Sequence, residues 1–205
     1  MRKYLVAAIA AALLLPATAQ TAAAKTNDNT TLRASSVAAS TPTRAQALSL
    51  QRTAAFNLAN RMAAQAPTAN WRQKSRNADL LSQRMRLPNI SHQERAIAIG
   101  RTQLGTRYRW GGTTPAGFDC SGFTRYAFGK AGKNLPRTAA QQKRAVRAVS
   151  TPRVGDLVFL GGRNPHHVGI YMGNNRMLHS PRTGKSVEVA RIWAKATYGR
   201  VACAP

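Results

Sequence analysis

Cysteine and acidic side chains are scarce in this chain of 205 residues, which has 2 Cys and 6 Asp and Glu against 31 Lys and Arg. Two cysteines form at most one bridge, which excludes a small scaffold held together by several disulfides. With so few acids the formal net charge is +25, and so basic a protein is expected to associate with a polyanion or an anionic surface. A compositional bias towards arginine would produce the same excess, so charge alone does not identify the ligand.

The chain has one long apolar run, and it lies at the N-terminus. Residues 1–19, MRKYLVAAIAAALLLPATA, combine a basic start, an apolar stretch and an Ala-Thr-Ala ending. This pattern is typical of a secretory signal peptide, with cleavage after Ala19 and a mature chain that begins at Gln20. Because no second such run follows, we expect an exported protein, periplasmic or extracellular, with no transmembrane segment in the mature chain.

Residues 20–87 are expected to form a basic N-terminal segment with two parts. Up to about residue 43 the segment has almost no large apolar side chains, which predicts a disordered tether. From 44 to 87 a weak helical period places Trp71, Ala78, Leu81 and Met85 near one face. A helix docked on the following domain or on an anionic surface explains this period, and a solvated basic linker is the alternative.

Residues 88–205 have the pattern of one folded domain. A capping box at 91–94 opens a helix expected to end at Gly105, Asp119 is the expected N-cap of a second helix, and RTAAQQKRAV predicts a short third one. Beyond it the apolar period changes to two, which predicts short strands at DLVFL, HVGIYM, RMLHS and SVEVARI. Helices followed by adjacent strands indicate an α+β domain, with N-terminal helices packed on an antiparallel sheet.

Cys120 lies in the first turn of the second expected helix, within GFDCSGF. Unpaired backbone N–H groups and the positive end of the helix dipole are expected to favour the thiolate there and to lower the pKa of the thiol. We therefore expect a free nucleophilic thiol and no disulfide. The alternative is a bridge between Cys120 and Cys203, which an oxidising compartment permits.

A nucleophilic thiol needs a base, and the histidines are the candidates. His92 is expected to be exposed in its capping turn. In the strand HVGIYM, His167 shares a face with Gly169, which leaves room beside it, while Val168 and Ile170 point to the core. His167 is therefore the expected base.

The register of the following hairpin decides whether His179 can reach His167. A three-residue loop over 173–175, or a bulge, pairs Gly169 with His179 and places His179 diagonal to His167 on one face. A two-residue Asn-Asn turn would put the two histidines on opposite faces. The first register makes Cys120, His167 and His179 a nucleophile, a base and an orienting residue.

Four blocks of the sequence carry a family resemblance. YRWGGTTPAGFDCSGF, LPRTAAQQ, GDLVFL and HHVGIYMGNNRMLHS occur in this order between about residues 91 and 201. They resemble the NlpC-type family of bacterial cell-wall cysteine peptidases, which has a papain-like fold. The resemblance does not extend to residues 20–87, and it does not identify the bond that is cut.

The resemblance implies a secreted peptidoglycan endopeptidase, a cell-wall hydrolase that cuts stem peptides through an acyl-enzyme. It implies no metal and no other cofactor. The expected partners are stem peptides and the anionic cell-wall surface, with no specific nucleic acid, and the chain is expected to be a monomer. The site residues it implies are Cys120 as nucleophile, His167 as base, His179 as third polar residue, Tyr108 against the thiol, and Asp119 and Ser121 beside the substrate groove.

Other interpretations of the same residues remain open. A non-catalytic cationic protein that binds cell-wall polymer or nucleic acid would keep the fold without the activity, although the complete Cys-His-His set favours the enzyme. A toxin of interbacterial competition would use the same chemistry on a different target cell. Tyr108 and Trp110 could equally be aromatic side chains that pack their own loop.

Overall fold

The structure is a computed structural model and describes residues 42–202. The expected signal peptide at 1–19, most of the expected tether and Cys203 lie outside the described residues. Among those described, no helix has the length and apolar character needed to cross a bilayer. The helices are α1 (Arg44–Gln65), α2 (Trp71–Arg84), α3 (His92–Arg101), α4 (Cys120–Lys130) and α5 (Ala139–Arg144).

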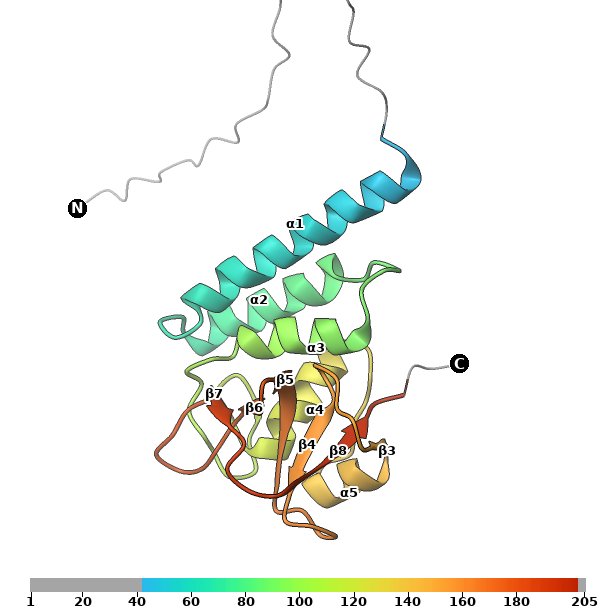
Figure 1. The fold of residues 1–205 in the computed structure, drawn as a ribbon. Coiled ribbons are helices and arrows are strands. Elements are labelled where there is room, and N and C mark those ends of the chain that lie inside the picture. The colour runs from blue at the N-terminus through green and yellow to red at the C-terminus, as the bar shows by residue number, and fades with distance from the viewer. Residues whose placement is uncertain (1–41, 203–205) are drawn as a thin grey trace, which may run out of the picture. The chain divides into compact units, whose positions relative to one another are not determined.

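Helices α1 and α2 pack on α3, and the three lie one above another in Figure 1. Thr43 caps α1 and Asn70 caps α2, because each side chain accepts a hydrogen bond from the third backbone N–H of its helix. Each helix then buries one apolar stripe in the core that α3 and α4 share: Ala55, Ala59 and Met62 from α1, and Ala78, Leu81 and Met85 from α2.

Residues 44–87 therefore form a pair of docked helices rather than a solvated linker. Trp71, expected near the same face as Ala78, Leu81 and Met85, is 51% exposed. It stands at the first position of α2, before the helix reaches the core, and the guanidinium of Arg72 lies over its ring. A separate domain that begins at residue 88 stays a prediction.

The three helices expected after residue 88 are present. Ser91 opens α3 through the expected capping box, but α3 ends at Arg101, so the expected end at Gly105 was wrong. The turns that follow α3 carry the chain to Gly105, whose positive φ of 75° suits glycine. His92, expected to be exposed, is buried, because its ring packs beside Phe128 and one ring nitrogen lies 3.0 Å from the carbonyl oxygen of Val201.

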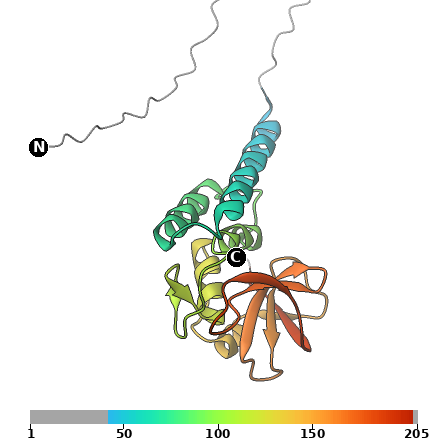
Figure 2. The same ribbon diagram turned by 90° about the vertical axis from the view of Figure 1, so that its left-hand side faces the viewer.

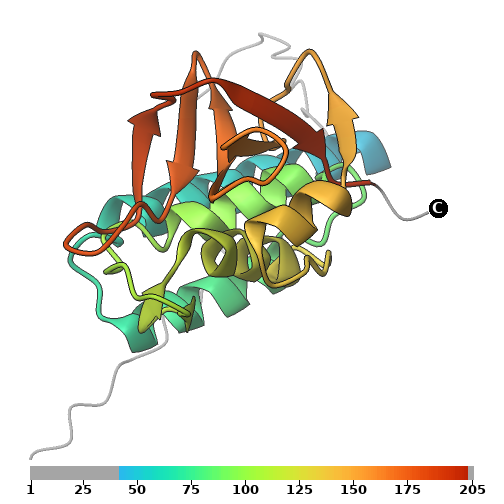
Figure 3. The ribbon, with the colours of Figure 1, turned by 90° about the horizontal axis from the view of Figure 1, so that it is seen from below.

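The sheet has six strands, each antiparallel to its neighbours, in the order β3-β8-β4-β5-β6-β7. Figure 3 shows it lying over the helices, which confirms the α+β class. The strands are β3 (Arg147–Val149), β4 (Leu157–Leu160), β5 (His167–Gly173), β6 (Arg176–His179), β7 (Glu188–Arg191) and β8 (Ala196–Arg200), and a separate hairpin joins β1 (Thr113–Thr114) to β2 (Gly117–Phe118).

The two faces of the sheet have different coverings. Phe159, Val168 and Ile170 point to the helices and belong to the main core. The other face carries a small apolar cluster of Val158, Leu160, Met177 and Ile192. Because β7 is an edge strand and β8 lies between β3 and β4, the connection from β7 to β8 has to cross the sheet, and Figure 2 shows this dark red segment over the strands.

The β5–β6 hairpin combines the two turns that the sequence left open. Asn174 and Asn175 both have positive φ, 49° and 53°, and form a two-residue turn in which Gly173 pairs with Arg176. The register then shifts between Tyr171 and Gly173, so that Ile170 pairs with Leu178. This bulge restores the register in which His167 and His179 share a face.

Candidate active site

The first turn of α4 presents the thiol. Asp119 is the N-cap, and its carboxylate accepts a hydrogen bond of 2.7 Å from the backbone N–H of Gly122. The cap confirms where the helix begins, and it fixes Cys120 as the first helical residue. A Cβ on Gly122 would lie 2.0 Å from the carbonyl oxygen of Gly112, so only glycine lets the preceding loop pack so tightly against this turn.

A cleft of about 410 Å³ opens over Cys120. Its thiol is free, and Sγ lies 4.0 Å from the carbonyl oxygen of His166, at the beginning of β5. The side chains and backbone around the cleft come from the loop before α4, from α5 and from the segment that enters β5. The lining residues are Tyr108, Trp110, Gly111, Asp119, Cys120, Ser121, Arg137, Thr138, Ala139, Ala140, Pro165, His166, His167 and Pro181.

The two expected histidines are in direct contact behind this cleft. Nε2 of His167 lies 2.8 Å from Nδ1 of His179, with the rings perpendicular and their centroids 5.0 Å apart. His167 lines the cleft, whereas His179 is 1% exposed. The structure thus brings Cys120 and His167 to one cleft and places His179 where it can orient His167.

Burial determines the charge of all three groups. It lowers the pKa of His167 to about 3, helped by the neighbouring His179 and His166, and lowers that of His179 to about 4. Burial also raises the pKa of the Cys120 thiol, which the nearby N–H groups of Val168, Ser121 and Cys120 itself only partly offset. The expected lowering of the thiol pKa was therefore wrong for the free protein, because desolvation outweighs the helix terminus. The resting site holds a neutral thiol and two neutral imidazoles.

Asp119 and Ser121 are held by an arginine for which the sequence analysis predicted no role. Arg137 donates hydrogen bonds to both carboxylate oxygens of Asp119 and one of 3.0 Å to the hydroxyl of Ser121. Although burial alone would raise the pKa of Asp119, these bonds and that of Gly122 lower it. All three side chains line the cleft, so an ion pair forms one of its walls.

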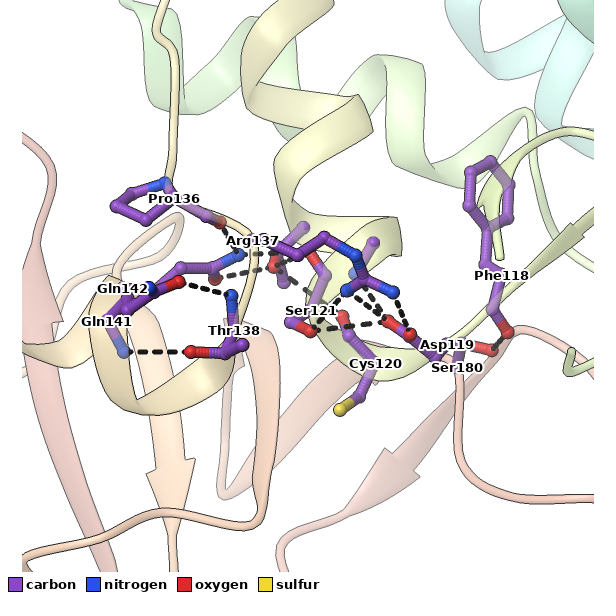
Figure 4. A network of polar contacts seen from close by, with 12 residues as sticks. Phe118, Asp119, Cys120, Ser121, Pro136, Arg137, Thr138, Gln141, Gln142 and Ser180 are labelled. Atoms are coloured by element: carbon purple, nitrogen blue, oxygen red, sulfur yellow. Dashed lines mark hydrogen bonds and ion pairs between the residues drawn. The ribbon is translucent and has the colours of Figure 1, made fainter. Parts of the chain in front are cut away.

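Helix α5 is attached to α4 through a buried glutamine. Nε2 of Gln142 donates to the carbonyl oxygens of Ser121 and Pro136, and its Oε1 accepts a bond of 2.7 Å from Thr124. Figure 4 shows this network beside the ion pair, with the sulfur of Cys120 pointing away from both. Cys120 and Arg137 are thus separate features of one cleft.

Comparison with known proteins identifies the family. The model described as "NlpC/P60 family" matches residues 105–203, and the solved NlpC/p60 domain of the peptidoglycan hydrolase SagA is 34% identical, with a TM-score of 0.50 and an alignment that covers 53% of this chain and 98% of that domain. The chain belongs to the NlpC/P60 family. The expected family and its papain-like fold are thereby confirmed.

Two curated relatives of this NlpC/P60 chain are named as peptidases. The gamma-D-glutamyl-L-lysine dipeptidyl-peptidase of Bacillus subtilis (strain 168) is 41% identical over 117 residues, which is 54% of this chain and 39% of that protein. The bifunctional muramidase/DL-endopeptidase CwlT of the same strain is 48% identical over 87 residues, 39% of this chain and 26% of that enzyme. The chain thus spans less than half the length of these relatives.

Another solved relative has been studied in variants. Structures of the resuscitation promoting factor interacting protein RipA carry mutations at a cysteine, a histidine and a glutamate, in that chain order. These structures are 33 to 35% identical to this chain, with a TM-score of 0.50, and the alignment covers 53% of this chain and 61% of theirs. This chain has Cys120 followed by His167 in the same order of cysteine and histidine, and its third expected residue, His179, is a histidine and not a glutamate.

Three aromatic side chains complete the surroundings of the NlpC/P60 site. Trp110 is 84% exposed at the rim of the cleft, so it does not pack its own loop. Trp193 lies against both histidines, and the sequence analysis missed it because it belongs to no periodic segment. Tyr108 lines the cleft, and the pKa of its hydroxyl is raised by burial and by the nearby Cys120 and Asp119. Within residues 42–202, no group of three or more His, Cys, Asp or Glu side chains is arranged to hold a metal ion.

Proposed function

We propose that this protein is an exported cysteine peptidase that cleaves stem peptides of peptidoglycan. Cys120 is the nucleophile, His167 the general base and His179 the residue that orients His167. The observation that carries the proposal is the shared cleft of Cys120 and His167, with His179 bonded to the far nitrogen of His167. This is the arrangement of a nucleophile, a base and an orienting group.

The neutral resting site determines the order of the proton transfers. Nδ1 of His167 takes the proton from the Cys120 thiol as the sulfur attacks the peptide carbonyl. The imidazolium then gives this proton to the leaving amine, the C–N bond breaks, and a thioester remains on Cys120. Water, deprotonated by His167, attacks the thioester; the released acid carries the water oxygen, and the thiol is restored.

The first turn of α4 supports the charged intermediate. The backbone N–H groups of Cys120 and Ser121 lie close enough to the sulfur to act on its pKa. At a helix N-terminus such groups have no intrahelical partner, so they are available to an oxyanion that forms on the carbonyl carbon attached to the sulfur. The hydrogen bonds from these N–H groups to the oxyanion strengthen only as the tetrahedral intermediate forms. They therefore stabilise the transition state more than the bound substrate, and this difference accelerates the reaction.

The cleft wall suits a peptide that carries its own charges. Tyr108, Asp119 and Ser121 are proposed to contact the substrate, and Arg137 leaves a guanidinium at the same wall. Stem peptides of peptidoglycan contain carboxylates and amines, for which such a wall offers partners of both signs. The names of two relatives, a gamma-D-glutamyl-L-lysine dipeptidyl-peptidase and a DL-endopeptidase, are consistent with this substrate class.

The export part of the proposal rests on residues 1–19, and the wall association rests on charge. The four ion pairs among residues 42–202 join Arg52, Lys130, Arg137 and Arg200 to acids, so the many other exposed arginines are available to anionic wall polymers. The chain is proposed to act as a monomer in the periplasm or outside the cell, attached to the wall.

Digestion of purified muropeptides, with mass spectrometry of the products, tests the activity. The wild-type chain is expected to release new peptide ends, Cys120→Ala to release none, and Cys203→Ala to behave as the wild type. Circular dichroism checks that all three are folded. Cleavage by Cys120→Ala at the wild-type rate would refute the mechanism, and a folded wild type that binds walls but cleaves no muropeptide would instead favour the non-catalytic wall-binding protein.

A further inference from the structure

The His167–His179 pair is shielded on a side where no core helix lies. Both side chains are nearly solvent-free, at 5% and 1% exposure, although they share the face that points away from α3 and α4. The connection that crosses this face contains Trp193. The centroid of its ring system lies 5.4 Å from that of His167 and 5.3 Å from that of His179.

The position of Trp193 is fixed by its neighbour in the chain. Ile192 is buried in the small cluster of this face, its N–H donates a bond of 2.9 Å to the carbonyl oxygen of Asn175, and Asn175 donates back over 3.5 Å. The crossing segment is thereby attached to the β5–β6 turn. Trp193 itself is 58% exposed and is not among the residues found to line the cleft, so it covers the pair from outside.

The proton positions explain why the pair needs a cover. To accept the thiol proton on Nδ1, neutral His167 must carry its hydrogen on Nε2 and donate it to Nδ1 of His179. His179 then carries its own hydrogen on Nε2. This atom is buried and has no hydrogen-bond partner among the described residues. A water molecule at either ring would compete for these N–H groups and could turn His167 away from the thiol.

We propose that Trp193 is a positioning residue that covers both imidazoles, excludes water from them and holds His167 in the orientation and tautomer that serve Cys120. The inference rests on the proposed function. It also accounts for the burial that lowers the pKa of both histidines, since removal of a ring of this size would open the pair to solvent. An aromatic ring at 193 is therefore expected to matter more than its indole nitrogen.

Burial is the largest cause of the lowered pKa of both histidines, and among the other ionisable groups near the pair only His166 adds to it, by lowering the pKa of His167. Glu188 faces His179 across β6 and β7, but its side chain is exposed. No titratable residue lies on β4. The remaining charged or titratable groups on these elements are His166 just before β5, Tyr171 on β5, Arg176 on β6, Arg191 on β7, Lys195 two residues after Trp193, and Asp119 with Cys120 at the start of α4.

Histidine titration by NMR tests the cover without any assay of activity. The Cε1–H resonances, assigned with His167→Gln and His179→Gln, should titrate well below pH 6.5 in the wild type. In Trp193→Ala both pKa values should rise by about one unit or more, in Trp193→Phe by much less, and in the remote control Trp71→Ala not at all. Unchanged histidine pKa values in a folded Trp193→Ala variant would overturn the proposal.

Kinetics and fluorescence complete the test. The acid limb of kcat/KM for muropeptides should move to higher pH in Trp193→Ala, and kcat should fall while KM changes little, with partial rescue by Trp193→Phe. If Trp193→Ala does not fold, Trp71→Phe/Trp110→Phe leaves Trp193 as the sole tryptophan. Its emission should be quenched as the imidazoles become charged, and emission that does not respond refutes the contact. Absence of peptidase activity in every variant would refute the proposed function while the NMR result stands.

Discussion

At the scale of single residues, the site is poised by desolvation rather than by charge. A thiol with a raised pKa and a histidine with a pKa of about 3 do not form an ion pair at neutral pH. In the proposed mechanism the thiolate has to be formed when substrate is bound, with His167 as the immediate acceptor of the proton. Reactivity therefore depends on the position of His167, which makes the neighbours of His167 as important as its basicity.

Alanine substitutions should separate the three histidines of the strand region. His167→Ala loses the proton transfer and should lower kcat by a factor on the order of 10² to 10⁴. His179→Ala should cost less, because water can partly replace its contact with Nε2 of His167. His166→Ala should have little effect on kcat, because this residue contributes to the site its backbone carbonyl, 4.0 Å from the thiol sulfur.

Steady-state kinetics on soluble muropeptides check this order, with thermal unfolding as the control for folding. Equal losses in folded His166→Ala and His167→Ala proteins would contradict the strand register as well as the assignment of the base.

Local rules pointed to Cys120 and His167, the proposed nucleophile and base, but not to the residues that support them. Cys120 could be predicted because an N-cap and a helix start are encoded within a few residues, and His167 because strand alternation separates it from Val168. Arg137 and Trp193 could not, because each reaches the site through a tertiary contact, with Asp119 in one case and with the histidine pair in the other. The direction of the thiol pKa was also beyond the sequence, since burial depends on packing.

At the scale of elements, the β5–β6 hairpin aligns His167 with His179. Its bulge moves the register by one residue, and Gly169 leaves the space that His179 occupies. A Cβ at Gly169 would lie 3.1 Å from both Cβ of His179 and Sδ of Met177, and 3.2 Å from the carbonyl oxygen of Leu178. His179, Met177 and Leu178 are all buried, so none of them has free space into which it could move away from an added Cβ.

Gly169→Ala should therefore displace His179 and lower kcat about tenfold or more, because small misplacements at a reacting centre are costly. Gly129→Ala is the matched control. Gly129 lies in α4 with no atom within 4 Å of its added Cβ, so alanine should stabilise that helix by about 0.5 to 1 kcal/mol without a change in kcat.

Kinetics and chemical unfolding distinguish the two glycines. Wild-type kcat in Gly169→Ala would mean that the hairpin adapts without moving His179, and the alignment argument would be wrong.

At the scale of the whole molecule, the sequence predicted the class of fold better than the way in which its strands and helices pack together. Alternation over DLVFL and HVGIYM was enough for β4 and β5, because their apolar faces repeat along the chain. The insertion of β8 beside β4 was not predictable, since it depends on a pairing between distant segments. The docking of α1 and α2 was one of the alternatives that the sequence left open, because half of the buried side chains named for these helices are alanines, which give a weak period.

This docking changes what a test of wall binding must alter. Removal of α1 and α2 would expose the core side chains that they cover, so loss of activity after a deletion would not report on binding. The outer side of α2 offers a better target: Arg72, Arg76 and Arg84 are exposed and form no ion pair among residues 42–202.

We expect the triple change Arg72→Gln, Arg76→Gln and Arg84→Gln to weaken binding to isolated cell walls, and wild-type binding to fall steeply as salt rises. Exposed charges are screened over about 8 to 10 Å at physiological ionic strength, and each arginine removed takes away one contact with the polymer. Turnover of small soluble muropeptides should stay unchanged, since α2 packs on α3 and α4 behind the cleft and does not line it.

A matched triple, Arg147→Gln, Arg153→Gln and Arg191→Gln, removes the same charge from exposed positions elsewhere in the chain. Co-sedimentation with walls across a salt series measures both variants. Equal weakening in the two would show that net charge rather than α2 carries the attraction, and no weakening in either would refute an electrostatic attachment of this surface to the wall.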